Sequence, residues 1–167
     1  MTIEVRPVLP GEHEEAGRVT ALAYREFVRP GDRDWEEYLG HIADVEGRAG
    51  STTVLVATED GNILGSATLE LDGRIDDDDP PLHPEEAHIR MLGVHPDARG
   101  HGIARSLIDA CFEAAREAGR SYITLHTTQR MKVAQGMYAA LGFERLEDRV
   151  FPDGFVLLTY RRSIPPA

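Results

Sequence analysis

Apolar side chains recur along this chain with two different periods, and the changes between them mark the predicted elements. Residues 2–7 alternate apolar and polar side chains, which predicts a first strand. Residues 11–28 and 34–48 space their apolar side chains as one face of a helix does, and Pro30-Gly31 is expected to stop the first of these helices. The runs 52–58 and 63–71 favour strands, and the Asp-Gly pair between them predicts a hairpin.

The second half of the chain alternates strands with helices. Residues 87–94 are almost continuously apolar, as expected of a central strand. Residues 104–118 form one apolar helical stripe that ends at Gly119. A strand at 121–127, a helix at 131–141 and a closing hairpin of 143–151 and 155–161 follow. The predicted order, β-α-α-β-β-β-α-β-α-β-β, is an α/β fold: a mixed sheet with helices on both faces, in a single domain over residues 1–167.

Composition narrows the classes of function. No apolar run approaches the ~18 residues of a membrane span, so we expect no membrane partner. The formal net charge of −11 makes a nucleic-acid partner unfavourable, because phosphate backbones would be repelled. The amino terminus lacks the apolar segment of a secretory signal, and Cys111 is the single cysteine, so we expect a cytoplasmic protein. The Asp-rich stretch 76–79 predicts a solvated loop.

The segment 89–108 holds the most informative chemistry. A central strand leads through a short loop with Gly100 and Gly102 into a helix. Small residues there let a ligand approach the backbone, and the helix amino terminus presents N–H groups with a partial positive charge. Arg99 and Arg105 flank this anion cradle, which suits a pyrophosphate. A plain tight turn also explains the glycines, and neither the P-loop nor the dinucleotide fingerprint is complete.

Three motifs resemble those of the GNAT superfamily of N-acetyltransferases. Residues 99–104, RGHGIA, are similar to the Arg/Gln-x-x-Gly-x-Gly/Ala signature that cradles the pyrophosphate of coenzyme A. Residues 92–94, LGV, resemble the bulged strand before it, and 138–143, YAALGF, the downstream Tyr-x-x-Leu-Gly-Phe element. The resemblance implies acetyl-CoA as acyl donor, held by the following residues: Leu92, Gly93, Val94, Arg99, Gly100, His101, Gly102, Ile103, Ala104 and Arg105.

The resemblance also implies how the site is arranged. The backbone of Leu92 and Val94 would pair with the pantetheine arm, and a splayed gap between the strands 87–94 and 121–127 would receive the thioester. Two positions depart from the family pattern. Met131 stands where many members carry an asparagine that bonds the cofactor, and His88 stands where many carry a glutamate on the central strand.

Acyl transfer to an amine needs proton transfers. An alkylammonium of pKa ~10.4 must lose a proton, at a cost of roughly 4–5 kcal/mol at pH 7. His88 is the candidate base, because its reference pKa of ~6.5 leaves it mostly neutral; strand alternation places it on one side with Arg90 and Leu92 as far as the expected bulge. A strand-end histidine with no such role is equally compatible. Glu26 or Tyr24 of the first helix, or a water chain, are the other possibilities.

The remaining steps involve a second side chain and the backbone. Tyr138 is the candidate acid that returns a proton to the departing thiolate, although a tyrosine on a helix stripe is often a core residue. The N–H of Val94 is the candidate donor to the thioester oxygen. The spacing of His83, His88, His95 and His101 fits no metal template, so we expect no metal. Cys111 lies on the apolar stripe of the helix 104–118, so we expect a core residue rather than a nucleophile.

The sequence thus predicts an acyl-CoA-dependent N-acetyltransferase that acts by direct attack in a ternary complex on a primary amine of a small molecule or peptide. A non-catalytic acyl-CoA sensor and a protein N-terminal or lysine acetyltransferase stay open as alternatives, as does a homodimer. Residues 24–38 and 73–86 are expected to contact the amine acceptor, which the sequence does not identify.

Overall fold

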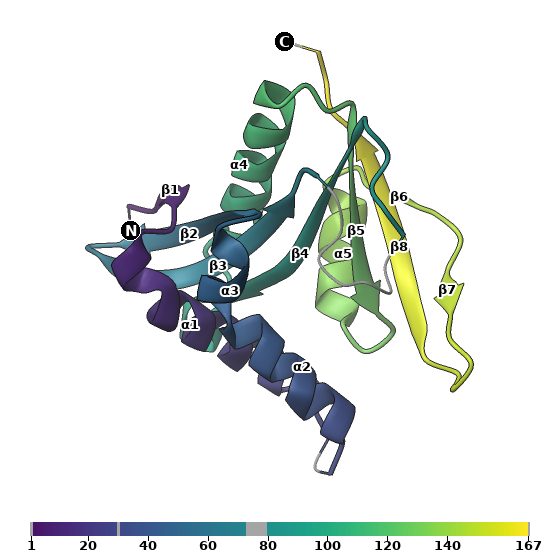
Figure 1. Cartoon of the computed structure of the whole chain (residues 1–167), viewed down its shortest axis with the longest axis horizontal. Coiled ribbons are helices and arrows are strands. Elements are labelled where there is room, and N and C mark those ends of the chain that lie inside the picture. The colour runs from purple at the N-terminus through teal and green to yellow at the C-terminus, as the bar shows by residue number, and fades with distance from the viewer. Residues whose placement is uncertain (1, 30, 73–79, 167) are drawn as a thin grey trace.

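The computed structural model describes residues 2–29, 31–72 and 80–166, and its strands form one mixed sheet (Figure 1). The strand order is β1-β2-β3-β4-β5-β8-β6, with β7 pairing to β8. Neighbouring strands are antiparallel except β4 and β5, which are parallel. The strands are β1 (Glu4–Pro7), β2 (Thr53–Glu59), β3 (Asn62–Glu70), β4 (Glu86–Val94), β5 (Tyr122–Thr128), β6 (Glu144–Arg145), β7 (Arg149–Val150) and β8 (Val156–Ser163).

Helices cover both faces of the sheet, as predicted. The α-helices are α1 (His13–Arg25), α2 (Arg33–Ala43), α3 (Val45–Ala49), α4 (Ile103–Glu117) and α5 (Lys132–Ala140), and short 3-10 turns lie at Pro10–Glu12 and Pro96–Ala98. The main core lies between the sheet and the α4 and α5 side, where Leu107 and Ile108 pack with strand residues. Smaller clusters lie under α1, α2 and α3.

The predicted helix at 34–48 is wrong as one element, because it is divided at Asp44. The Asp44 carboxylate accepts a hydrogen bond from the N–H of Gly47 at 2.9 Å and so caps α3. The buried guanidinium of Arg48 donates to the carbonyls of His41 and Ile42 at 2.8 and 2.9 Å. These bonds satisfy carbonyl groups that a continuous helix would have used, so the chain turns here.

The predicted closing hairpin is also interrupted. Glu144 and Arg145 pair with β8, and the chain pairs again with the same strand at Arg149. Between them Arg145 and Asp148 form an ion pair at 3.0 Å, which closes the intervening turn. Short β6 and β7 therefore replace one long strand.

The first hairpin is confirmed, and the turn has the expected geometry. Asp60 and Gly61 connect β2 to β3 with φ values of 50° and 81°, the positive pair that a type I′ turn requires. The helix stop expected at Pro30 and the loop expected at 76–79 lie outside the described residues. None of the described helices is long and apolar enough to cross a membrane.

Candidate active site

The loop between β4 and α4 forms one half of the candidate site. Gly100 and Gly102 have positive φ values of 82° and 75°, which favour glycine. Gly102 is also the N-cap of α4, and no described side chain caps the helix or places an acid in its first turn. A Cβ added at either glycine meets no described atom within 4 Å. The first N–H groups of α4 therefore face open space, an arrangement that fits a pyrophosphate.

The side chains of this loop have different surroundings. Arg99 forms an ion pair with Glu26 at 2.6 Å, which joins the loop to the end of α1. His101 and Arg105 are exposed. Ile103 is buried in the main core, so of this residue only the backbone is available to a ligand. The backbone rather than the side chains makes this cradle.

β4 separates from β5 beside the loop (Figure 1). The parallel register joins His88 to Thr124 and Ile89 to Leu125, and the described pairing ends there. Past Ile89, the edge of β4 that faces β5 is thus released from the ladder. This is the position of the splayed gap predicted for the thioester.

A β-bulge in β4 lies at the same place. Met91 has a φ of 53°, and the pairing with β3 jumps by one residue there. Met91 packs with Leu39 and Ile42 of α2, whereas Leu92 and Val94 pack against the α4 side. The predicted bulge is therefore present. It reverses the alternation, so that His88, which lines a cavity with Met91, does not share a face with Leu92.

Gly93 has a packing reason to be glycine. A Cβ there would lie 2.9 Å from the Cβ of Ala23 and 3.3 Å from the carbonyl oxygen of Thr20. α1 therefore crosses β4 closely at the bulge. The absence of a side chain at Gly93 lets the amino-terminal helix reach the gap.

Tyr138 lies on α5, on the other side of the gap. Its side chain is 6% exposed and packs against Phe143 and Tyr160, with ring centroids 5.8 and 5.7 Å away. Burial raises the pKa of Tyr138, so the phenol keeps its proton. Tyr138 also interacts electrostatically with Tyr24 of α1, whose pKa is raised mainly by burial. Tyr24 lines the cavity with Met91, whereas Tyr138 lies in the main core on the α4 and α5 side of the sheet.

The second half of the candidate site is a cavity of about 750 Å³ on the α1 and α2 side of the sheet. Its walls come from distant parts of the chain, including α1, α2, β4, β5 and the turn before β8. Trp35 of α2 contacts Phe155 before β8 and Tyr38 of its own helix, with ring centroids 6.2 and 5.7 Å away. The volume lies within the range of small-molecule sites.

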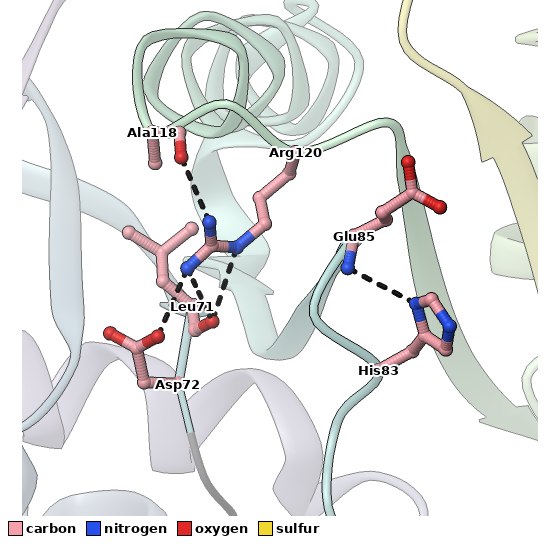
Figure 2. Close-up of polar contacts among 6 residues, drawn as sticks. All are labelled: Leu71, Asp72, His83, Glu85, Ala118 and Arg120. Carbon is pink, nitrogen blue, oxygen red and sulfur yellow. Dashed lines mark hydrogen bonds and ion pairs between the residues drawn. The ribbon is translucent and has the colours of Figure 1, made fainter.

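Hydrogen bonds hold both ends of the segment expected to contact the acceptor. Figure 2 shows Arg120 bonded to the carbonyl oxygens of Leu71 and Ala118 and paired with Asp72 at 3.0 Å. The same view shows the N–H of Glu85 donating to the ring of His83 at 3.1 Å. Of the expected segment 73–86, residues 73–79 lie outside the described chain, and positions 80–82 and 86 line the cavity.

His88 lies in the cavity wall and is 8% exposed. Its Nδ1 is 2.8 Å from the hydroxyl oxygen of Thr124, which donates in turn to the carboxylate of Glu86 at 2.5 Å. The ring of His126 is 4.8 Å away. Burial, with smaller contributions from His126 and Arg90, lowers the pKa of His88 to about 3. The ring is neutral at pH 7, as expected. The cause is burial, however, and not the ordinary pKa of histidine on which the expectation was based.

Three site residues, Thr124, His126 and Phe155, were not predicted from the sequence, and Trp35 was predicted only as part of the segment 24–38. One signal was available for the first two: positions 124, 126 and 128 place a polar side chain at every second residue of a central strand. Polar groups on one face of a buried strand indicate a lined cavity. The contact between Trp35 and Phe155 joins residues 120 positions apart, and only the fold reveals it.

Two further expectations concern metals and Cys111. The described residues contain no group of three or more His, Cys, Asp or Glu side chains placed to hold a metal ion. Cys111 is fully buried, and burial raises the pKa of its thiol to about 12. It therefore serves as a core residue of α4.

Two named acetyltransferases are similar to this chain in sequence. The mycothiol acetyltransferase of Cellulomonas flavigena is 29% identical over 149 residues, which cover 86% of this chain and 41% of that protein. A probable N-acetyltransferase family 8 member 5 of Mus musculus is 33% identical over 90 residues, which cover 54% of this chain and 37% of that protein. The chain thus spans less than half the length of these relatives.

A solved structure and a family model agree on the fold. The yncA protein of Salmonella typhimurium, determined with its cofactor acetyl-CoA, has a TM-score of 0.71 at 18% identity and covers all of this chain, which covers 96% of it. The model of the acetyltransferase (GNAT) family matches residues 17–143, which include the loop, the bulge and α5. This chain belongs to the GNAT acetyltransferase family.

Proposed function

We propose that this chain transfers an acetyl group from acetyl-CoA to a primary amine of a small molecule, by direct attack in a ternary complex. One observation carries the proposal: an uncapped helix N-terminus and a cavity of about 750 Å³ meet at the same separated strands. The site therefore offers an anion cradle on one side and room for an acceptor on the other. The acetyl-CoA bound to a relative of the same fold supports the choice of donor.

On the donor side, acetyl-CoA is bound mainly by backbone groups. Acetyl-CoA supplies the activated acetyl group as a thioester. The N–H groups of residues 100–105 hold its pyrophosphate through hydrogen bonds and the positive end of α4. The released edge of β4 at Leu92 and Val94 binds the pantetheine arm, and the N–H of Val94 donates to the carbonyl oxygen as negative charge develops there.

Two side chains move the protons. The neutral ring of His88 accepts the proton that leaves the amine nitrogen as the carbon–nitrogen bond forms. Tyr138 carries its phenolic proton and donates it to the departing sulfur; because burial raises its pKa, it is a weak acid, and the proton moves only as negative charge develops on the sulfur. Glu26 is a weaker candidate for the base, because its carboxylate is paired with Arg99 at 2.6 Å and it is not among the residues that line the cavity.

The size and walls of the cavity favour a small acceptor. Residues of α2 and of the turn before β8 meet over it through Trp35 and Phe155. Aromatic walls take up the apolar part of a small molecule, whereas an open groove would suit a protein chain. A small-molecule amine is therefore preferred over a protein terminus or lysine.

The test is a thiol-release assay with acetyl-CoA and a panel of aminoglycosides, polyamines, amino acids and short peptides. We expect amine-dependent release of coenzyme A with at least one small amine and the acetylated amine by mass spectrometry. Release with peptides alone would move the assignment to protein acetylation. Acetyl-CoA binding without release by any amine would favour the acyl-CoA sensor.

A further inference from the structure

The hydrogen bonds around His88 continue beyond the ring and reach a carboxylate. His88, Thr124 and Glu86 come from two adjacent parallel strands, and each contacts the next at hydrogen-bond distance: 2.8 Å from ring to hydroxyl and 2.5 Å from hydroxyl to carboxylate. The N–H of His83 donates to the other oxygen of Glu86 at 3.2 Å. The chain of contacts thus ends on a carboxylate that the backbone also holds.

The donors in this chain determine the tautomer of His88. A carboxylate can only accept, so the single hydroxyl proton of Thr124 is used on Glu86. The hydroxyl oxygen can then accept from His88 but cannot donate to it, which requires a proton on Nδ1. Nε2 consequently carries the lone pair, and it is the ring nitrogen left for the cavity that His88 lines.

We infer that Thr124 and Glu86 are positioning residues that hold His88 in the Nδ1–H tautomer and form a proton relay from the acceptor cavity. This inference rests on the proposed function. The attacking amine nitrogen loses its proton to Nε2, the Nδ1 proton passes to Thr124, and the hydroxyl proton of Thr124 passes to Glu86. One N–H bond of the amine is broken, one O–H bond forms on Glu86, and the positive charge leaves the amine.

The relay resolves a difficulty that His88 alone would face. The His88 side chain is 8% exposed, the centroid of the His126 ring is 4.8 Å from its own, and Arg90 is nearby. A positive imidazolium is therefore unfavourable here. Passing one proton in and another out leaves the ring neutral. The charge is neutralised instead on Glu86, which starts as an anion. Burial at His88 is therefore compatible with its role in the relay.

Other ionisable groups also face this ring. Glu70 of β3 is the register partner of His88, Arg90 follows on β4, and His126 projects from β5. Glu70 offers a competing route for the proton. The experiment therefore changes Glu70 and Glu86 separately.

The first measurement is nitrogen NMR of the protein labelled in its histidine rings, recorded without substrates. A His88→Gln spectrum assigns the signals. We expect the Nδ1–H tautomer of His88, with Nε2 unprotonated, from pH 6 to 8. Thr124→Val, which keeps the shape but removes the hydroxyl, should shift His88 toward the Nε2–H form. Wild-type His88 in the Nε2–H form overturns the inference, whether or not the protein acetylates any amine.

The second measurement is turnover with the panel amine that gives the fastest thiol release. Thr124→Val and Glu86→Gln should each lower kcat roughly tenfold, below the range of a group that itself exchanges a proton with substrate, and leave the KM for acetyl-CoA unchanged. Thr124→Ser should restore most of the rate. Thr159→Val is the matched control, because this threonine contacts the neighbouring ring of His126 at 3.2 Å and should change neither rate nor tautomer.

Three outcomes of the turnover measurement would count against the relay: an unchanged rate in Thr124→Val, no rescue by serine, or a large loss in Glu70→Gln with none in Glu86→Gln. If Thr124→Val does not fold, Glu86→Gln and the wild-type tautomer decide. Failure of the proposed function looks different, since no panel amine would release thiol while the tautomer could still be as inferred.

Discussion

The loop at residues 99–105 and the cavity around His88 meet at the same separated strands, but the chain builds them in opposite ways. The loop is one short stretch, largely exposed, and presents backbone N–H groups at the start of α4. The cavity is lined by side chains between Tyr24 and Leu157, several of them buried. A ligand on the first side is recognised through the main chain, and one on the second through side chains.

This difference separates what relatives share from what each one selects. Backbone recognition tolerates changes of side chain as long as the glycines and the helix start are kept, so it suits a donor common to a family. A cavity assembled from α2, β5 and the turn before β8 changes with any of these elements. Acceptor preference should therefore vary while donor binding is retained.

The largest expected effect is a loss of coenzyme A affinity when the loop at residues 99–105 is changed at Gly102. Gly102→Val places a β-branched side chain at a φ of 75° and over the open face of the cradle. Loss of two hydrogen bonds to a charged group, at about 1.5–3 kcal/mol each, weakens coenzyme A binding roughly 10³-fold. Titration calorimetry measures the dissociation constant.

Gly119→Val is its control, because Gly119 lies beyond the opposite end of α4 with a φ of 79° and equally open surroundings. It imposes similar backbone strain without touching the cradle. Equal losses of affinity in the two variants would mean that strain, not the loop, explains the effect.

The next effect tests the boundary between the two regions. Tyr138→Phe keeps the ring contacts with Phe143 and Tyr160 and removes the phenolic proton. We expect kcat to fall by about 10²-fold while acetyl-CoA affinity stays within a factor of two or so. Single-turnover kinetics measure the chemical step. A wild-type rate there would leave Tyr138 as packing and assign the acid elsewhere.

A smaller effect tests the acceptor side. Trp35→Ala removes the contact with Phe155 that joins α2 to the turn before β8 over the cavity. The KM for the amine should rise about tenfold, in line with about 1.4 kcal/mol for one lost aromatic contact, and coenzyme A binding should not change. Trp35→Phe, which keeps a ring, should recover part of the loss. A change in coenzyme A affinity instead would contradict the separation of the two sides.

The loop could be predicted from the sequence more fully than the cavity, because the loop is built from neighbouring residues and the cavity from distant ones. A strand, two glycines and a helix start lie next to one another in the chain, so local pattern predicted the loop, and the resemblance of residues 92–94 to the family motif implied the bulge near Gly93. The division of the second helix at Asp44 depended on Arg48 binding carbonyls of the preceding turn, which no periodicity reveals. The contact between Thr124 and His88 and the contact between Trp35 and Phe155 depend on how distant strands and helices come together.

The smallest effect compares one histidine from each region through the stability of the fold. The pKa of His88 is lowered from its ordinary ~6.5 to about 3 by burial, so the unfolded chain binds this proton more readily than the folded one. Stability from His88 is therefore present above about pH 6.5 and is lost as pH falls toward 3. The loss is at most about 1.4 kcal/mol per pH unit.

Urea unfolding at pH 7, 6 and 5 measures this loss. Wild type should lose stability on acidification more steeply than His88→Gln, by about 1 kcal/mol between pH 6 and pH 5. His101→Gln changes an exposed histidine of the donor loop. Because this ring is not buried, the variant should lose stability on acidification as wild type does. The two difference curves thus compare the regions directly. If His88→Gln follows wild type as well, the ring is hydrated or already charged in the folded protein, and the neutral relay through Thr124 loses its basis.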